Sequence, residues 1–216
     1  MKREDIAAII KKERVIAIVR TKEQLQIPEL IQDLVEGGIK VIEITSNTPR
    51  YLEEIAKAKK RYANFDIIIG AGTVTNVQIA NAAIKAGAQF LVTPNTNTEV
   101  LALAHHNNIP VAMGALTPTE ICLAAGYGAD IIKLFPAGDL GISYFKSVKA
   151  PLDTITFFVV GGINLSNIEE WIAAGISGVG LGAALTKQDK NTSADSYRGN
   201  TIQKFVKIIK ESQWKN

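Results

Sequence analysis

The sequence predicts one α/β domain over residues 1–216, folded as a (β/α)8 TIM barrel with an extra N-terminal helix. Two observations carry this prediction. Short apolar runs rich in Val and Ile alternate with longer amphipathic segments, and the alternation repeats eight times. The chain of 216 residues is also long enough, because such barrels form from about 200 residues upward. Alternating strands and helices imply parallel pairing with right-handed crossovers, so the alternative is an open doubly wound sheet.

The eight expected strands are short and contain few polar residues, as strands buried on both faces do. In chain order they span residues 15–19, 41–45, 67–71, 90–93, 111–113, 131–135, 157–160 and 178–182. Apolar spacings of three and four predict helices of about ten to fifteen residues between them. Pro28 and Pro118 mark two helix starts, and glycines such as Gly87 and Gly175 mark helix ends.

Two segments lie outside the eight repeats. Residues 1–12 predict an additional helix that covers one end of the barrel. Residues 187–200 are polar, and we expect them to form a mobile loop before a last, Lys-rich helix. Neither segment has the composition of a linker between domains.

The composition argues against several classes of function. A hydrophobic fraction of 47% and a charged fraction of 21% are those of an ordinary globular protein, and no segment predicts a signal peptide or a membrane span. The net charge of +3 is too small and too dispersed to predict nucleic-acid binding. The only cysteine, Cys122, excludes an intramolecular disulfide and favours the cytoplasm. His105 and His106 are adjacent on a predicted helix, so we expect both to face solvent and no metal to bind.

Lys133 is the first candidate catalytic residue. It lies within a predicted buried strand, with two apolar residues on each side. A lysine is rarely buried without a function, and burial lowers the pKa of its ammonium group. A neutral amine is the form that attacks a ketone to make a Schiff base. The alternative is a lysine on a strand face that reaches solvent.

Glu43 is the second candidate catalytic residue. Strand alternation places it on the same face as Val41 and Thr45, away from Ile42 and Ile44. A carboxylate in an apolar strand needs a partner, and Lys133 across the barrel lumen is the natural one. Glu43 is then a general acid and base, or alternatively one half of a structural ion pair.

The active site of such a barrel lies at the carboxyl ends of the strands, and further candidates occur there. Arg20 ends the first strand, where it could bind a carboxylate or be an ordinary surface residue. Thr73 follows the third strand with a hydroxyl and an N–H group, and Thr93 and Pro94 end the fourth. Gly and Pro occur in many loops, so each of these strand-end motifs alone is weak evidence for a site.

Glycine-rich loops follow the seventh and eighth strands. Gly161 and Gly162 end the seventh, and Gly182 and Ala183 end the eighth. Loops at these two positions are the usual phosphate site of this barrel, because their N–H groups and a helix start hold the anion. The pair therefore predicts a phosphate-binding site.

Together these residues resemble the family of 2-keto-3-deoxy-6-phosphogluconate (KDPG) and 4-hydroxy-2-oxoglutarate (KHG) aldolases. The resemblance covers roughly residues 14–185. The motifs that carry it are Glu43-Ile44-Thr45, Gly70-Ala71-Gly72-Thr73-Val74, Thr93-Pro94, Lys133-Leu134-Phe135-Pro136 and Gly161-Gly162-Ile163. Their occurrence in this order is specific to the family, although no single motif is.

The resemblance implies a class I aldolase that needs no metal or other cofactor and works as a homotrimer. It implies that Lys133 forms the Schiff base with a 2-keto acid substrate and that Glu43 shuttles protons. The other residues that it places around the pyruvate part of the substrate are Thr73, Thr93, Pro94 and Phe135.

The sequence departs from the family pattern at three places. Enzymes of the gluconate branch often have Arg where this chain has Asn47, and Pro-Thr where it has Val159-Val160. These residues look more like those of the 2-keto-3-deoxy-6-phosphogalactonate branch. Ala183 stands where the family usually has Ser, so one side-chain donor to phosphate is missing. The unphosphorylated substrate KHG therefore stays in consideration.

We expect an aldolase that cleaves KDPG to pyruvate and glyceraldehyde 3-phosphate, or KHG to pyruvate and glyoxylate. The first alternative is the aldolase specific for the phosphogalactonate substrate. More distant alternatives are a phosphate-binding barrel isomerase or epimerase, and a non-catalytic protein that binds a sugar phosphate. Neither of these needs a lysine in the middle of a strand, so the activity of a Lys133→Ala variant distinguishes them from an aldolase.

Overall fold

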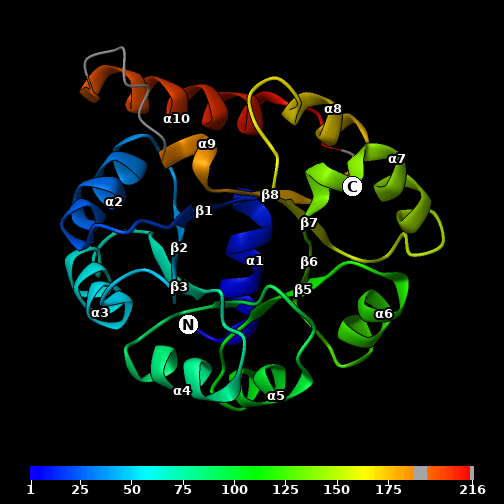
Figure 1. The fold of residues 1–216 in the computed structure, drawn as a ribbon, viewed down its shortest axis with the longest axis horizontal. Coiled ribbons are helices and arrows are strands. Elements are labelled where there is room, and N and C mark those ends of the chain that lie inside the picture. Colours follow the sequence, from blue (N-terminus) through cyan, green and yellow to red (C-terminus); the bar gives the residue numbers. More distant parts are fainter. Residues whose placement is uncertain (187–193, 215–216) are drawn as a thin grey trace.

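A closed eight-stranded barrel surrounded by helices forms the centre of the molecule (Figure 1). The computed structural model describes residues 1–186 and 194–214, with the backbone alone for residues 194–197. All neighbouring strands are parallel, and β8 pairs with β1 through Ile16 and Gly180. This pairing closes the sheet, so the predicted (β/α)8 barrel is confirmed and the open sheet is excluded.

The strands lie close to their predicted positions. They are β1 (Val15–Val19), β2 (Val41–Thr45), β3 (Ile68–Gly72), β4 (Leu91–Val92), β5 (Val111–Ala115), β6 (Ile131–Leu134), β7 (Phe157–Val160) and β8 (Gly178–Leu181). The prediction for β4 was too long, because the chain leaves the sheet after Val92. There the Thr93 hydroxyl donates to the carbonyl of Asn95 at 2.7 Å and turns the backbone inward.

The helices surround the strands, except for α1, which lies at one end of the barrel. They are α1 (Arg3–Glu13), the 3-10 helix η1 (Gln24–Gln26), α2 (Ile27–Glu36), α3 (Tyr51–Arg61), α4 (Val77–Lys85), α5 (Thr98–His106), α6 (Pro118–Gly126), α7 (Ala137–Lys149), α8 (Ile168–Ala173), α9 (Ala183–Thr186) and α10 (Ala194–Glu211). The start of α6 shows why the local sequence predicted it. The Thr117 hydroxyl accepts from the N–H of Glu120, whose carboxylate accepts from the N–H of Thr117.

The last helix begins earlier than the sequence predicted. α10 starts at Ala194, so the prediction of a loop over residues 187–200 was wrong for residues 194–200, and residues 187–193 lie outside the described part. Arg198 in the first part of α10 is 7% exposed and forms ion pairs with Asp33 and Glu29 of α2. These tertiary ion pairs hold the polar first turns of α10 in place. Their partners are distant in the sequence, so the local pattern did not predict a helix here.

The apolar core has two layers. One lies between the strands and the outer helices, and the other fills the lower part of the barrel lumen. Ile6 and Ile10 of α1 belong to the lumen layer, where they join Ile16, Phe90 and Phe158 of the barrel. The predicted N-terminal helix therefore closes the amino end of the barrel.

A polar cluster fastens α1 to the barrel. The Nη1 atom of Arg3 lies 2.8 Å from Nδ1 of His105, and Nε2 of His105 lies 3.0 Å from a carboxylate oxygen of Asp130. The same oxygen of Asp130 accepts from the N–H of Val111 at the start of β5. The expectation that His105 faces solvent was therefore wrong. Its partners lie far away in the sequence, whereas its neighbour His106 is exposed as expected.

Candidate active site

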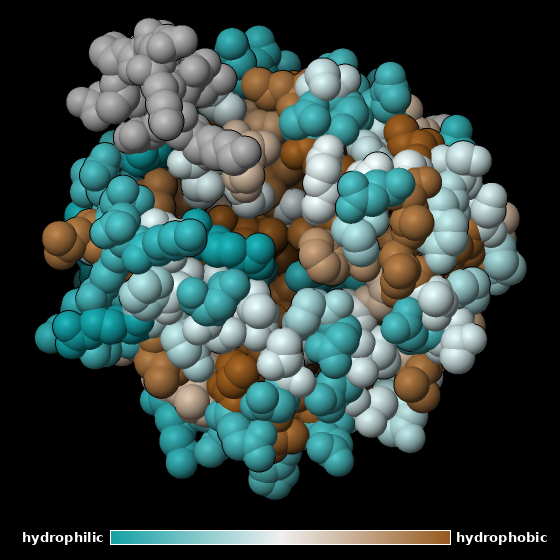
Figure 2. Space-filling view, viewed as in Figure 1, coloured by the Kyte–Doolittle hydropathy of each residue, from teal (hydrophilic) through white to brown (hydrophobic). Residues whose placement is uncertain are grey.

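A cavity of about 790 Å³ opens at the carboxyl ends of the strands. Figure 2 shows this face with a hollow at its centre that has apolar walls. The residues that line the cavity are Ile18, Arg20, Asn47, Thr73, Pro94, Lys133, Phe135, Val160, Gly161, Gly162, Ile163, Asn164, Gly180, Gly182, Ala183, Ala184 and Thr186. Nine of the eleven predicted site residues are in this wall; Glu43 and Thr93 are the exceptions.

Lys133 projects from β6 into the barrel and is only 5% exposed. Its strand neighbours are Gly114 and Phe158, and its Nζ lies 4.9 Å from the centre of the Phe135 ring. Burial lowers the pKa of the Lys133 ammonium below its ordinary value, because the charged form loses its hydration. The carboxylate of Glu43 opposes this change and the charge of Arg20 adds to it, and the net shift is toward the neutral amine, which is the form that attacks a carbonyl.

Glu43 is even more deeply buried, at 1% exposure, and lies beneath the wall of the cavity. Glycine on the next strand makes room for it, since a Cβ atom at Gly72 would overlap the carboxyl group of Glu43 and lie 2.5 Å from its Cγ. Burial raises the pKa of the Glu43 carboxyl, while the positive charges of Lys133 and Arg20 act in the opposite direction. The structure thus brings the two predicted catalytic residues into one electrostatic unit inside the lumen.

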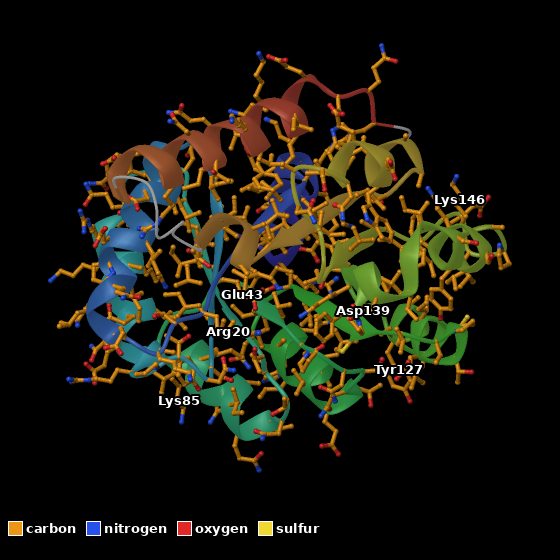
Figure 3. The ribbon with its side chains drawn as sticks, turned by 45° about the horizontal axis from the view of Figure 1, so that its top comes forward. Arg20, Glu43, Lys85, Tyr127, Asp139 and Lys146 are labelled. Carbon is orange, nitrogen blue, oxygen red and sulfur yellow. The ribbon has the colours of Figure 1, made fainter. Side chains whose placement is uncertain are left out.

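Arg20 lies near the centre of the barrel together with Glu43, while the other labelled side chains lie on the outer helices (Figure 3). Its guanidinium donates to the hydroxyl of Thr73 at 3.3 Å. Thr73 has a φ of 55°, a backbone conformation that a β-branched residue rarely adopts, and Ser46 donates to its carbonyl at 2.8 Å. These contacts hold Thr73 in its strained conformation beside the cavity, as happens at functional sites.

Thr93 is not among the residues that line the cavity, and its contact with substrate stays a prediction. It is fully buried, and its hydroxyl accepts from the N–H of Gly114 at 2.8 Å while it donates to Asn95. A Cβ atom at Gly114 would lie 2.6 Å from both the Thr93 carbonyl and the Asn95 nitrogen. Thr93 and Gly114 therefore hold the β4 loop inside the barrel mouth, which places Pro94 in the cavity wall beside Lys133.

The glycine loops after β7 and β8 form the opposite wall. Gly161 and Gly162 have φ values of 91° and 76°, which favour glycine. The Asn167 side chain donates to the carbonyl of Gly162 at 2.9 Å and fixes this turn. Gly182 and Ala183 lie at the start of α9. The predicted phosphate-site residues thus share one wall of the cavity, and none has a polar side chain.

The wall also contains residues that were not predicted as site residues, among them Ile18, Asn164 and Thr186. Strand alternation from Ile16 through Ile18 to Arg20 could have identified Ile18 as facing the lumen. Asn164 follows the glycine pair directly, so its position was a signal as well. Thr186 lies at the end of the four-residue α9, which no sequence periodicity reveals.

A second cavity, of about 550 Å³, lies at the other end of the barrel near α1 and Lys40. It contains neither Lys133 nor any glycine loop. Within residues 1–186 and 194–214, no cluster of three or more His, Cys, Asp and Glu side chains is placed to bind a metal ion. In the same part of the chain, no helix is both long and apolar enough to cross a membrane.

Comparison with known proteins agrees with this geometry. The sequence model of the KDPG and KHG aldolase family matches residues 6–199. The chain is 33% identical over 180 residues to the 2-dehydro-3-deoxy-6-phosphogalactonate aldolase of Escherichia coli, covering 83% of this chain and 86% of that protein. It is 37% identical over 161 residues to the 2-dehydro-3-deoxy-phosphogluconate aldolase of Treponema pallidum, covering 74% of this chain and 76% of that protein.

A solved structure is similar over nearly the whole fold. It is the KDPG aldolase of Legionella pneumophila, with pyruvate captured as a covalent carbinolamine intermediate. The TM-score is 0.80 at 26% identity, and the match covers 94% of this chain and 97% of that one. The family model matches most of the chain, and the barrel lumen contains the buried lysine and carboxylate. The chain therefore belongs to the KDPG/KHG aldolase family.

Proposed function

We propose that this protein is a class I aldolase that cleaves a 2-keto-3-deoxy-6-phospho sugar acid to pyruvate and glyceraldehyde 3-phosphate. The observation that carries the proposal is the buried pair of Lys133 and Glu43 below a cavity whose far wall consists of glycine loops. The end with Lys133 and Glu43 suits a keto acid, and the end with the glycine loops suits a phosphate. An isomerase or epimerase needs the glycine loops but not the lysine, so the buried lysine favours the aldolase.

Lys133 acts first. The lone pair of its neutral amine attacks C2 of the keto acid, and the resulting carbinolamine loses water to give an iminium ion. Burial supports this role because it lowers the pKa of the Lys133 ammonium and so makes the neutral amine easier to reach. Arg20 and Thr73, joined by a hydrogen bond at the cavity wall, bind the substrate carboxylate, with Pro94 and Phe135 packing against the three-carbon portion.

Glu43 moves the protons. It gives a proton to the departing water, then takes the proton of the C4 hydroxyl as the C3–C4 bond breaks. The electron pair of that bond flows to the iminium nitrogen, so an aldehyde leaves and an enamine remains. Protonation of the enamine at C3 and hydrolysis release pyruvate and restore the amine. Burial raises the pKa of the Glu43 carboxyl, and this suits the exchange because the carboxyl then holds a proton more readily than an exposed glutamate does.

The phosphogalactonate substrate is the second candidate, and two residues of the cavity favour it. Asn47 and Val160 both line the cavity, and these are the positions at which the sequence departs from the gluconate branch. The two sugar acids differ in configuration at a hydroxyl carbon, and a valine in the wall offers that hydroxyl no hydrogen bond. Cleavage of KHG remains the third candidate, because Ala183 has no side-chain donor for a phosphate.

We further propose that the enzyme works in the cytoplasm as a homotrimer, without a metal or other cofactor. Exposed apolar side chains support association between copies: Leu123 and Tyr127 on α6 and Leu140 on the neighbouring α7. Figure 2 shows apolar surface on this side of the molecule. Sedimentation of the purified protein tests the trimer, and activity after dialysis against a chelator tests the independence from metal.

Trapping with borohydride tests the central proposal. Incubation with pyruvate and borohydride is expected to attach reduced pyruvate to the peptide that contains residue 133. The Lys133→Met variant is expected to remain unlabelled and inactive, while Lys146→Met, on the outer side of α7, labels like the wild type (Figure 3). Full aldol cleavage without labelling of residue 133 would refute the Schiff-base mechanism. Pyruvate release from KDPG, its galactonate isomer and KHG, measured side by side, ranks the substrates.

A further inference from the structure

The phosphate end of the cavity contains few polar side chains. Gly161, Gly162, Gly182 and Ala183 offer only backbone groups there. Among the described residues that line the cavity, just two polar side chains come from the segments after β7 and β8, namely Asn164 and Thr186. The other polar side chains in the wall belong to β6 and to the segments after β1, β2 and β3. Within residues 1–186 and 194–214, the candidate side-chain donors to a ligand at this end are therefore Asn164 and Thr186.

The orientation of the Asn164 amide is determined by its neighbour. Its Oδ1 accepts from the backbone N–H of Ser166 at 2.9 Å and from the Ser166 hydroxyl at 2.6 Å. A backbone N–H can only donate, so the atom that faces it must be the amide oxygen. This leaves Nδ2, with two N–H groups, and no residue in the described part of the chain accepts from it. Asn164 thus presents a pair of donors at the rim of the cavity.

Thr186 has no such donor to offer. Its hydroxyl donates its single proton to the carbonyl of Gly182 at 3.2 Å. With that proton engaged, the hydroxyl oxygen has only lone pairs left, and lone pairs repel an anion.

We propose that the Nδ2 group of Asn164 binds the terminal phosphate of the substrate and so selects phosphorylated over unphosphorylated sugar acids. This inference rests on the proposed aldolase function and adds a specificity-determining residue to it. The two N–H groups of Nδ2 complement the backbone N–H groups of the glycine turn beside it. Because the Ser166 contacts fix the amide before any ligand arrives, the donors are already oriented.

Asn164→Asp is the sharpest test. The variant keeps an oxygen for Ser166 to donate to, but it replaces the two donors with a negatively charged oxygen. For the phosphorylated substrate we expect KM to rise roughly tenfold or more, the effect of losing a hydrogen bond to a charged group. For the unphosphorylated KHG, kcat/KM is expected to stay within about twofold. Asn164→Ala removes the donors without adding a charge and should raise KM in the same direction but less.

Thr186→Val is the matched control in the same wall, and it should change KM for either substrate by no more than about twofold. Inorganic phosphate is the second probe, because it should inhibit the wild type and Thr186→Val more strongly than Asn164→Asp. The inference is overturned if Asn164→Asp keeps the wild-type KM for the phosphorylated substrate, or if both substrates lose activity equally. Borohydride trapping of pyruvate separates the two proposals, since the wild type must label whether or not Asn164 binds phosphate.

Discussion

Replacement of Gly72 by alanine tests whether the catalytic carboxylate depends on space left by its neighbouring strand. Gly72 is the last residue of β3, and its missing side chain is what allows Glu43 to lie in the lumen. A Cβ atom at this position would overlap the Glu43 carboxyl group and approach its Cγ to 2.5 Å. The overlap involves the functional group itself, so the carboxylate must move away from its place beside Lys133.

The size of the effect follows from these contacts. Insertion of a methyl group into a filled interior costs about 1–3 kcal/mol of stability. For a chain of this size, the melting temperature should fall by about 2–4 °C for each kcal/mol. Displacement of a general acid and base lowers the rate by about 10²–10⁴-fold, so we expect kcat of Gly72→Ala to fall within that range. The loss of kcat should therefore far exceed what the modest loss of stability explains.

Gly70→Ala is the matched control, one layer deeper in the same strand. A Cβ atom there would overlap the ring of Phe90, which belongs to the apolar lumen layer and not to the site. It should cost a similar amount of stability while kcat stays within about fivefold of the wild type. The assay is pyruvate release in steady state, together with thermal unfolding of each variant.

A double variant completes this test. Truncation of Glu43 to alanine removes the overlap, so Gly72→Ala should cost far less stability in a Glu43→Ala background than in the wild type. Wild-type kcat in Gly72→Ala, or an equal loss of kcat in Gly70→Ala, would show that the carboxylate does not depend on this space.

Three further predictions concern charges. The double variant Lys133→Met/Glu43→Gln should be inactive yet more stable by about 1–4 kcal/mol in thermal melts at neutral pH, because two buried ionisable groups are removed. The raised pKa of Glu43 means that its contribution to wild-type stability is present below the unfolded value of about 4.3 and is lost as pH rises through the folded pKa. A double variant with the same pH dependence as the wild type would contradict this. Arg20→Met should raise the pKa of Lys133, so the acid limb of the kcat/KM profile moves to higher pH; an unmoved limb would exclude this influence. Asp130→Ala should cost about 1–3 kcal/mol with kcat unchanged, because it removes the carboxylate partner of Arg3, of His105 and of the N–H of Val111. A fall in kcat would mean that the α1 cluster affects the site.

The fold was predictable because its signals are local and repeated. Eight apolar runs give eight strands, and the closed pairing of β8 with β1 follows from their number and spacing. Lys133 stood out because a charge within an apolar strand is rare, and Glu43 stood out for the same reason. Both side chains lie inside the barrel, as the alternation of the strands required.

The details that the sequence did not reveal depend on contacts between distant residues. Thr93 was predicted as a substrate contact, and the sequence did not show that the N–H group of Gly114 on the next strand donates to its hydroxyl. His105 was expected to face solvent, but Arg3 at the other end of the chain reaches it. The first turns of α10 appeared as loop sequence until Arg198 was seen to pair with α2. In each case the partner is fixed by the tertiary fold and leaves no local pattern.

Helix α1 closes the amino end of the barrel, so the active-site cavity is open at one end only. Ile6 and Ile10 occupy the floor of the barrel, so solutes exchange only through the carboxyl-end opening. In the proposed mechanism the three-carbon fragment is attached to Lys133 at the bottom of this cavity, and the aldehyde fragment lies above it. We therefore expect release in a fixed sequence, with glyceraldehyde 3-phosphate first and pyruvate second, and water for hydrolysis must follow the departing aldehyde inward. We therefore expect pyruvate to be the product that inhibits the free enzyme, because pyruvate alone can enter the empty cavity and react with the lysine.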